Sequence, residues 1–264
     1  MEEFDEEDEI MRYPAGPEPA AEAIPEPEAL SRIDNAAVPS TNQTIFPARE
    51  VDLRPKRLDP RLVAFSDFDP RDIAPYNRLV ISLISAAASR KLKRVLIASA
   101  QNGDGRTTIT LNLAAALARA RQRVLVVESD FLRPSALRLL GVDSASGLAE
   151  AVARGLGPSN AMVWLQPIGF NLLPTCAQVE NSAELLASPV FDVMMRNLSP
   201  EFDFILFDSA PLLQAADASL LELHTDATLL VIRQGRTSAN QMAKAVSLLN
   251  EERLLGAVLN RVAS

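Results

Sequence analysis

The sequence is poor in the residues that most often build metal centres and covalent crosslinks. Its 264 residues include one cysteine, Cys176, and one histidine, His224. A single thiol cannot form an internal disulfide, which is consistent with a reducing compartment such as the cytoplasm. Because His224 has no partner histidine or thiol cluster, it is better interpreted as a surface or helix-end residue than as a zinc ligand.

Long apolar runs and a broad basic face are also missing. No apolar run approaches the roughly 18–20 residues of a membrane-spanning helix, and the acidic N-terminus lacks the pattern of a signal peptide. The net charge of −8 comes from residues 1–30, which hold eleven acidic residues and one arginine, while the other 234 residues sum to +2. We therefore expect no nucleic-acid partner.

Residues 1–70 are predicted to form a disordered acidic and proline-rich tail and linker. Glu2–Glu9 is nearly all acidic, and prolines recur as far as Pro70. Such a composition buries too little apolar area to offset the entropy of the chain. The rest of the chain, residues 71–264, is predicted to be one domain.

In this domain, short apolar runs alternate with segments of helical period. Strands are predicted at 94–99, 123–128, 170–173, 204–207, 227–232 and 256–259, and helices at 75–88, 107–120, 147–154, 183–198, 216–223 and 239–250. Buried strands separated by helices indicate right-handed βαβ units. The predicted fold class is α/β, with a mostly parallel twisted sheet and helices on both faces.

The stretch Arg94–Leu113 carries the most informative motif. An apolar run is followed by a turn that contains Gly103 and Gly105, and then by a segment of helical period. Strand, glycine-rich turn and helix is the layout of a phosphate-binding loop, because backbone N–H groups and the helix N-terminus attract phosphate. The fold is therefore predicted to be P-loop NTPase-like. The residues predicted to bind nucleotide here are Gly103, Asp104, Gly105, Arg106, Thr107 and Thr108.

Acidic residues at two strand ends complete the predicted site. Asp208 closes a four-residue apolar strand in the manner of a Walker B motif, and Glu128 and Asp130 close a neighbouring strand. A threonine hydroxyl and carboxylates are the hard oxygen ligands that Mg²⁺ prefers. We predict that Thr107, Glu128 and Asp208 bind Mg²⁺. The residues predicted to be catalytic are Arg106, Glu128 and Asp130.

Taken together, these motifs resemble those of the bacterial tyrosine kinases of capsule and exopolysaccharide synthesis, a family of deviant-Walker P-loop ATPases. The resemblance covers about residues 72–262 and rests on Val95–Thr108, Val124–Pro134, Phe204–Pro211 and several later segments. It implies a cytoplasmic domain that binds ATP and Mg²⁺ at the inner face of the cell membrane. It also implies a membrane-embedded polysaccharide chain-length regulator as partner, assembly into a homo-oligomeric ring, and a place near the adenine for Asn260 and Arg261.

The sequence departs from the family pattern within the catalytic motifs. Arg106 stands where the family has Lys, Glu128 replaces an Asp, and Leu132 occupies the place of an Arg, with Arg133 next to it. Guanidinium is bulky and planar, and Glu moves the carboxylate by a methylene group. Because phosphoryl transfer depends on positioned charge, these changes predict a reduced rate more than reduced binding.

Two further departures bear on assembly and on the phosphoacceptor. Of the family's oligomerisation motif only Arg78 remains, and no tyrosine cluster precedes Ser264. Tyr76 is expected to be packed, which leaves Tyr13 as the exposed candidate acceptor.

Three functions are therefore weighed from the sequence. The chain is an ATP-dependent tyrosine kinase with altered catalytic residues, a non-catalytic nucleotide-binding regulator of polysaccharide export, or a positioning ATPase of the partitioning or division-site type. Gln101 counts against the last function, because that group carries a second signature lysine in the loop.

Overall fold

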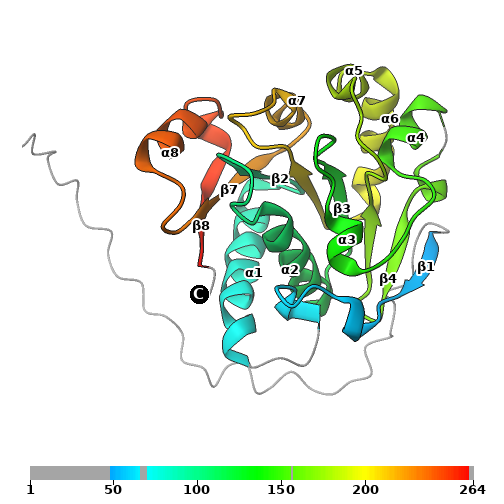
Figure 1. Ribbon diagram of the computed structural model, residues 1–264, viewed down its shortest axis with the longest axis horizontal. Coiled ribbons are helices and arrows are strands. Elements are labelled where there is room, and N and C mark those ends of the chain that lie inside the picture. Colours follow the sequence, from blue (N-terminus) through cyan, green and yellow to red (C-terminus); the bar gives the residue numbers. More distant parts are fainter. Residues whose placement is uncertain (1–47, 66–69, 156, 262–264) are drawn as a thin grey trace, which may run out of the picture. The chain divides into compact units, whose positions relative to one another are not determined.

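The computed structural model describes residues 48–65, 70–155 and 157–261, all within the unit Asn42–Ser264. The predicted disorder of residues 1–47, including Tyr13, thus lies outside the described residues. Eight strands form one sheet in the order β1-β4-β5-β3-β6-β2-β7-β8 within this part of the chain (Figure 1). They are β1 (Arg49–Asp52), β2 (Arg94–Ser99), β3 (Val124–Ser129), β4 (Val163–Gln166), β5 (Phe170–Leu173), β6 (Phe204–Ser209), β7 (Ala227–Arg233) and β8 (Leu254–Asn260).

The sheet is mostly parallel, as the sequence predicts. From β5 to β8 in the sheet order, the strands β5, β3, β6, β2, β7 and β8 pair with one another in parallel. Strand β4 is antiparallel to β5, and β1 runs parallel to β4. The carboxyl ends of the parallel strands therefore meet at one edge, where open α/β sheets bind their ligands.

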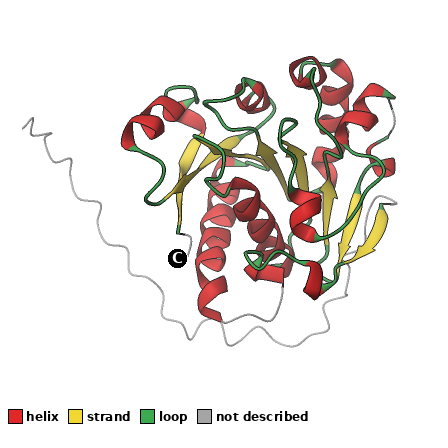
Figure 2. Cartoon of the chain, in the orientation of Figure 1, coloured by secondary structure: helices red, strands yellow, loops and turns green. Residues whose placement is uncertain are grey.

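Helices cover both faces of the sheet, which confirms the predicted fold class. Helices α1 and α2 pack on one face, and α4 to α8 lie on the other (Figures 1 and 2). No helix in the described ranges has the length and hydropathy that crossing a membrane requires. The α-helices are α1 (Pro70–Arg90), α2 (Arg106–Arg119), α3 (Ala136–Leu140), α4 (Leu148–Ala153), α5 (Ser182–Leu186), α6 (Pro189–Leu198), α7 (Asp217–Glu222) and α8 (Ala239–Val246), with 3₁₀ helices at Pro55–Arg57, Val63–Phe65, Pro158–Asn160, Ser199–Glu201 and Glu251–Arg253.

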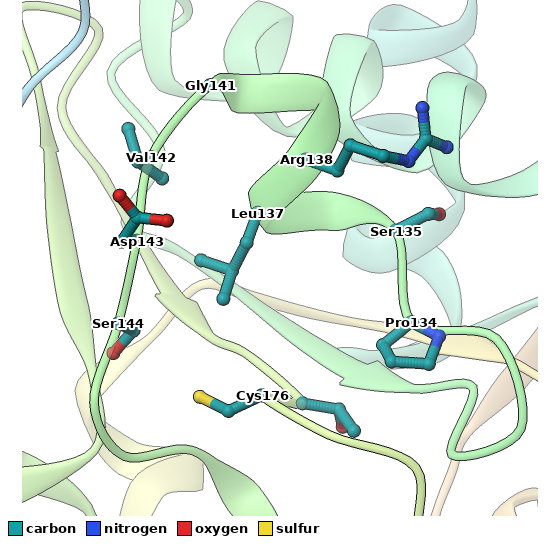
Figure 3. A pocket seen from close by; sticks show the side chains of 10 residues that line it. Pro134, Ser135, Leu137, Arg138, Gly141, Val142, Asp143, Ser144 and Cys176 are labelled. Atoms are coloured by element: carbon teal, nitrogen blue, oxygen red, sulfur yellow. The ribbon is translucent and has the colours of Figure 1, made fainter.

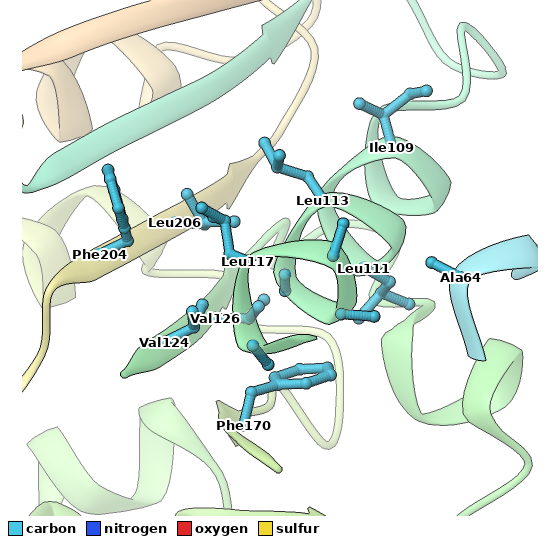
Figure 4. Packing of buried hydrophobic residues seen from close by; sticks show 14 of the residues in the cluster. Ala64, Ile109, Leu111, Leu113, Leu117, Val124, Val126, Phe170, Phe204 and Leu206 are labelled. Atoms are coloured by element: carbon cyan, nitrogen blue, oxygen red, sulfur yellow. The ribbon is translucent and has the colours of Figure 1, made fainter. Parts of the chain in front are cut away.

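The central strands are apolar throughout because each contributes to two cores. Alternate side chains of a strand point to opposite faces, so Val95 and Ile97 pack with α1 and α2, and Leu96 packs on the other side. Figure 4 shows Leu113 and Leu117 of α2 among residues of β3 and β6. This packing fixes α2, and with it the loop that precedes α2.

Part of the predicted linker is folded against the domain, so the predicted boundary at residue 70 is wrong. Strand β1 pairs with β4, and Leu62, Ala64 and Phe65 are buried in the core that contains α2. The side chain of Asn112 in α2 accepts a hydrogen bond from the Ala64 N–H at 2.8 Å and donates one to the Arg61 carbonyl at 2.9 Å. Few apolar residues suffice here, because they extend an existing core.

Two predicted helices differ from the observed ones. The helix predicted at 183–198 is divided into α5 and α6, because Ser188 caps a new helix through its hydroxyl and Pro189 occupies the first turn. Helix α1 begins at Pro70 and contains Pro75 in its interior. Strands β1 and β4 were not predicted, and β1 lies within the segment predicted to be a linker.

The contribution of the segment before α1 can be measured with Phe65→Ala. Phe65 is 6 % exposed and makes an edge-to-face contact with Phe170 at 5.9 Å between ring centroids. Loss of a buried aromatic ring should lower the free energy of unfolding by about 3–5 kcal/mol, measured by urea denaturation. Ile81→Ala, at a 69 % exposed position, is the control and should change stability by less than about 0.5 kcal/mol. Equal effects would contradict the packing role of Phe65.

Candidate functional site

The glycine-rich turn lies between β2 and α2 at the carboxyl edge of the sheet. Gly103 and Gly105 have φ of +82° and +93°, in the left-handed region that favours glycine. Gly105 immediately precedes α2. The first N–H groups of a helix have no intrahelical partner and carry partial positive charge. The turn is therefore shaped to receive a phosphate group.

Polar residues after β7 and at the end of β8 hold this turn in place. The Asn260 side chain donates to the Asp104 carbonyl at 2.8 Å, and the Thr237 hydroxyl donates to the Asp104 carboxylate at 2.9 Å. The Arg233 guanidinium donates to the Gly103 carbonyl at 2.8 Å. Two segments that are distant from the loop in sequence, residues 233–237 and the end of β8, thus fix it.

These contacts bear on Asn260 and Arg261, which the family resemblance places near the adenine. Asn260 lies against the loop backbone, whereas Arg261 is exposed just beyond β8. Arg233 and Thr237 were not predicted as site residues, although they lie in or beside segments that match the family pattern. Their contacts with the loop span 130 and 133 residues of sequence, which no local pattern reveals.

Arg106 is buried and is directed at two carboxylates. Its Nη2 lies 2.6 Å from Asp130 Oδ2 and its Nε 3.2 Å from Asp208 Oδ1. Its Nη1 donates to the Ser99 hydroxyl at 2.8 Å. The three charged side chains are 6 %, 5 % and 1 % exposed, for Arg106, Asp130 and Asp208 respectively. The structure thus brings these predicted residues together, with the arginine engaged by three strand ends.

Asp208 keeps one carboxylate oxygen available. Its Oδ2 is buried and has no hydrogen-bond partner among the described residues. Burial raises the pKa of Asp208 to about 6, while the Arg106 charge and the Thr107 hydroxyl act in the opposite direction. Thr107 and Asp208 therefore offer neighbouring hard oxygens.

This pair of oxygens fits Mg²⁺, which is commonly held by one or two carboxylates together with substrate phosphates and water. No group of three or more His, Cys, Asp or Glu side chains in the described residues is arranged to hold a metal by itself. A magnesium ion at Thr107 and Asp208 would therefore depend on phosphate oxygens for the rest of its coordination.

Glu128 is directed at the backbone. Its Oε1 accepts hydrogen bonds from the Ser135 and Ala136 N–H groups at 2.6 and 2.7 Å, and its Oε2 accepts one from the Thr175 N–H at 3.1 Å. Burial raises the pKa of Glu128 to about 7, against the effect of these hydrogen bonds. The contacts tie the start of α3 to the segment after β5. They give no support to the predicted catalytic and metal-binding roles of Glu128.

A cavity of about 180 Å³ opens at the loop and is rich in arginine. Besides Arg106, its lining includes Arg61, Arg133 and Arg138, while Leu132 is 41 % exposed and is not among the lining residues. Arg133 thus brings a guanidinium to the site from the position after Leu132. Arg61 was missed because it lies in the predicted linker, and Arg138 because α3 is too short to give a periodic pattern.

A second cavity, of about 420 Å³, adjoins the first and shares Ser135 and Arg138 with it. Figure 3 shows Leu137 directed into this cavity on the side of Cys176, and Arg138 extending away from Leu137. Burial raises the pKa of the Cys176 thiol, so the thiolate form is disfavoured. The cavity is therefore better suited to binding than to thiol chemistry.

The fit between the loop and β8 can be tested with Gly105→Ala. A Cβ on Gly105 would lie 2.0 Å from Asn260 Nδ2. This variant should lose at least about 1 kcal/mol more stability than Gly235→Ala, which has a positive φ but open space around it. In the double variant with Asn260→Ala, which removes the clashing atom, the loss should be smaller than the sum of the single losses. Additive losses in urea denaturation would contradict this close approach.

The structural role of Glu128 predicts a large effect of Glu128→Ala on stability without any ligand. Removing the carboxylate leaves three N–H groups, two of them buried, without an acceptor, so the free energy of unfolding should fall by about 3–5 kcal/mol. Glu184→Ala, at an exposed position in α5, is the control and should have little effect. A stability loss confined to Mg²⁺-containing buffer would instead favour the predicted metal role.

Comparison with known proteins agrees with this geometry. The family described as the CobQ/CobB/MinD/ParA nucleotide binding domain matches residues 95–264. The chain is 27 % identical over 209 residues to tyrosine-protein kinase YwqD of Bacillus subtilis strain 168, covering 78 % of this chain and 88 % of the relative. It is 29 % identical over 181 residues to the succinoglycan biosynthesis transport protein ExoP of Rhizobium meliloti strain 1021, covering 66 % of this chain and 23 % of ExoP.

A solved structure shares the fold over a similar range. The kinase domain of the Escherichia coli tyrosine kinase ETK superposes with a TM-score of 0.72 at 25 % identity. The match covers 79 % of this chain and 83 % of that domain.

Proposed function

Because the chain belongs to the CobQ/CobB/MinD/ParA nucleotide-binding domain family, we propose that it is an ATP-binding protein of the bacterial tyrosine-kinase type. The observation that carries this proposal is the loop before α2, with two glycines at positive φ and the Thr107 and Asp208 oxygens beside it. The phosphates of ATP would bind the loop amides, and Thr107 and Asp208 would hold Mg²⁺. When bound, this ion supplies positive charge at the phosphate oxygens.

The residues around the loop have distinct roles in this proposal. Arg133 and Arg138 line the loop cavity and meet the negative charge of the terminal phosphate. The adjoining cavity, on the other side of Ser135 and Arg138, receives the acceptor side chain. Asn260 keeps the loop in place and lies on the side that receives the adenine.

We place this activity in exopolysaccharide or capsule biosynthesis, at the cytoplasmic face of the membrane and with a membrane-embedded chain-length regulator as partner. The motif resemblance and the likeness to ExoP support this assignment. Ring assembly has less support, because exposed Ile81 replaces the second arginine of the family's oligomerisation motif while Arg78 is exposed nearby. We therefore leave the ring out of the proposal.

A second candidate function is a nucleotide-binding regulator that does not transfer phosphate. The observation in its favour is the engagement of Arg106 by Ser99, Asp130 and Asp208. A guanidinium that donates to these three side chains does not stabilise the charge on a phosphoryl group during its transfer.

Calorimetry and a phosphotyrosine assay on the same preparation decide between the two functions. ATP with Mg²⁺ should bind the wild-type protein, and phosphotyrosine should form slowly. Arg106→Lys should raise the rate by about tenfold or more, since an ammonium group restores a compact phosphate ligand.

A Tyr13→Phe variant serves as the control for the acceptor. ATP binding without phosphotyrosine, both in the wild type and in Arg106→Lys, would favour the regulator. Absence of ATP binding would contradict both functions.

A further inference from the structure

Arg106 is the centre of a buried charge cluster beside the proposed nucleotide site. The cluster contains the carboxylates of Asp130 and Asp208, and both lie within ion-pair distance of the guanidinium, at 2.6 and 3.2 Å. The three formal charges sum to −1, and the arginine removes half of the negative charge of the two acids. In phosphate-loop sites, a divalent cation commonly offsets charge at this position.

The energies of the alternatives indicate that Arg106 stays with these carboxylates when a phosphate binds. Breaking a buried ion pair leaves the other charge uncompensated, which costs more than one charge-assisted hydrogen bond to a phosphate typically contributes. Turning Arg106 toward a phosphate would therefore cost more than it gains, since two carboxylates would lose their partner.

Other cations are available to the phosphates. Arg133 and Arg138 line the cavity that also contains Gly103, Gly105 and Thr107. The negative charge of the phosphates can thus be balanced by Arg133, Arg138 and the loop amides, while Arg106 balances the charge of the two carboxylates.

We propose that Arg106 is a built-in cation that supplies, between Asp130 and Asp208, much of the charge that Mg²⁺ supplies in phosphate-loop sites. Nucleoside diphosphate binding by this chain consequently depends little on Mg²⁺. This inference rests on the proposed nucleotide binding and deepens it, because it names the residue that sets the metal requirement.

The test is the ratio of the ADP dissociation constants measured by calorimetry in EDTA and in excess Mg²⁺. For the wild-type chain this ratio should be below about threefold, and for Arg106→Gln above about tenfold, which is about 1.4 kcal/mol. Arg106→Lys should lie between the wild type and Arg106→Gln, because the ammonium group keeps the positive charge but does not match the planar geometry that contacts Asp130, Asp208 and Ser99.

Arg119→Gln is the matched control, because it removes one exposed positive charge at the opposite end of α2 and should keep the wild-type ratio. Circular dichroism checks that each variant is folded, and the wild-type ratio decides even if an Arg106 variant fails to fold. A wild-type ratio above about tenfold, or equal ratios in wild type and Arg106→Gln, would overturn the inference and leave nucleotide binding intact. No ADP binding in either buffer would overturn the proposed function itself.

Discussion

The buried ion pairs of Arg106 with Asp130 and Asp208 join three strand ends that the sheet places side by side. Taking a charge out of water costs several kcal/mol, and the cost is recovered only when partners are close and correctly oriented. The guanidinium meets this condition by donating hydrogen bonds to Ser99 at the end of β2, to Asp130 just after β3 and to Asp208 near the end of β6. The carboxyl edge of the sheet is thus held by a side chain of the helix that begins there.

Glu128 and Asp130, two acidic residues near the end of β3, have different roles because their side chains contact different groups. Glu128 lies in β3 on the face of Val124 and Val126, which is the face covered by α2. There it accepts hydrogen bonds from the N-terminal N–H groups of α3. Asp130 lies beyond the strand and accepts the Arg133 N–H at 3.0 Å as well as the guanidinium. One carboxylate therefore positions α3, and the other balances charge.

Much of the fold could be predicted because the central strands are buried on both faces and give continuous apolar runs. The same reasoning fails for residues 61–65, whose burial depends on the polar side chain of Asn112 and on a core built by later residues. It also fails for the partners of the loop. Arg233, Thr237 and Asn260 contact it from the end of the chain, and only the assembled sheet brings them there.

The role of Arg106 shows the limit of reasoning from one motif position. From the sequence alone, arginine in place of lysine is interpreted as a poorer phosphate-binding residue. That interpretation assumes that the side chain at position 106 contacts the phosphate. In the folded chain Arg106 contacts other groups, since its planar guanidinium donates to two carboxylates and to Ser99 at once. Alternation along the strands places Ser99 and Asp208 on the α2 face, with Ile97 and Leu206. An arginine in the first turn of α2 thus meets oxygen acceptors before it can reach a phosphate.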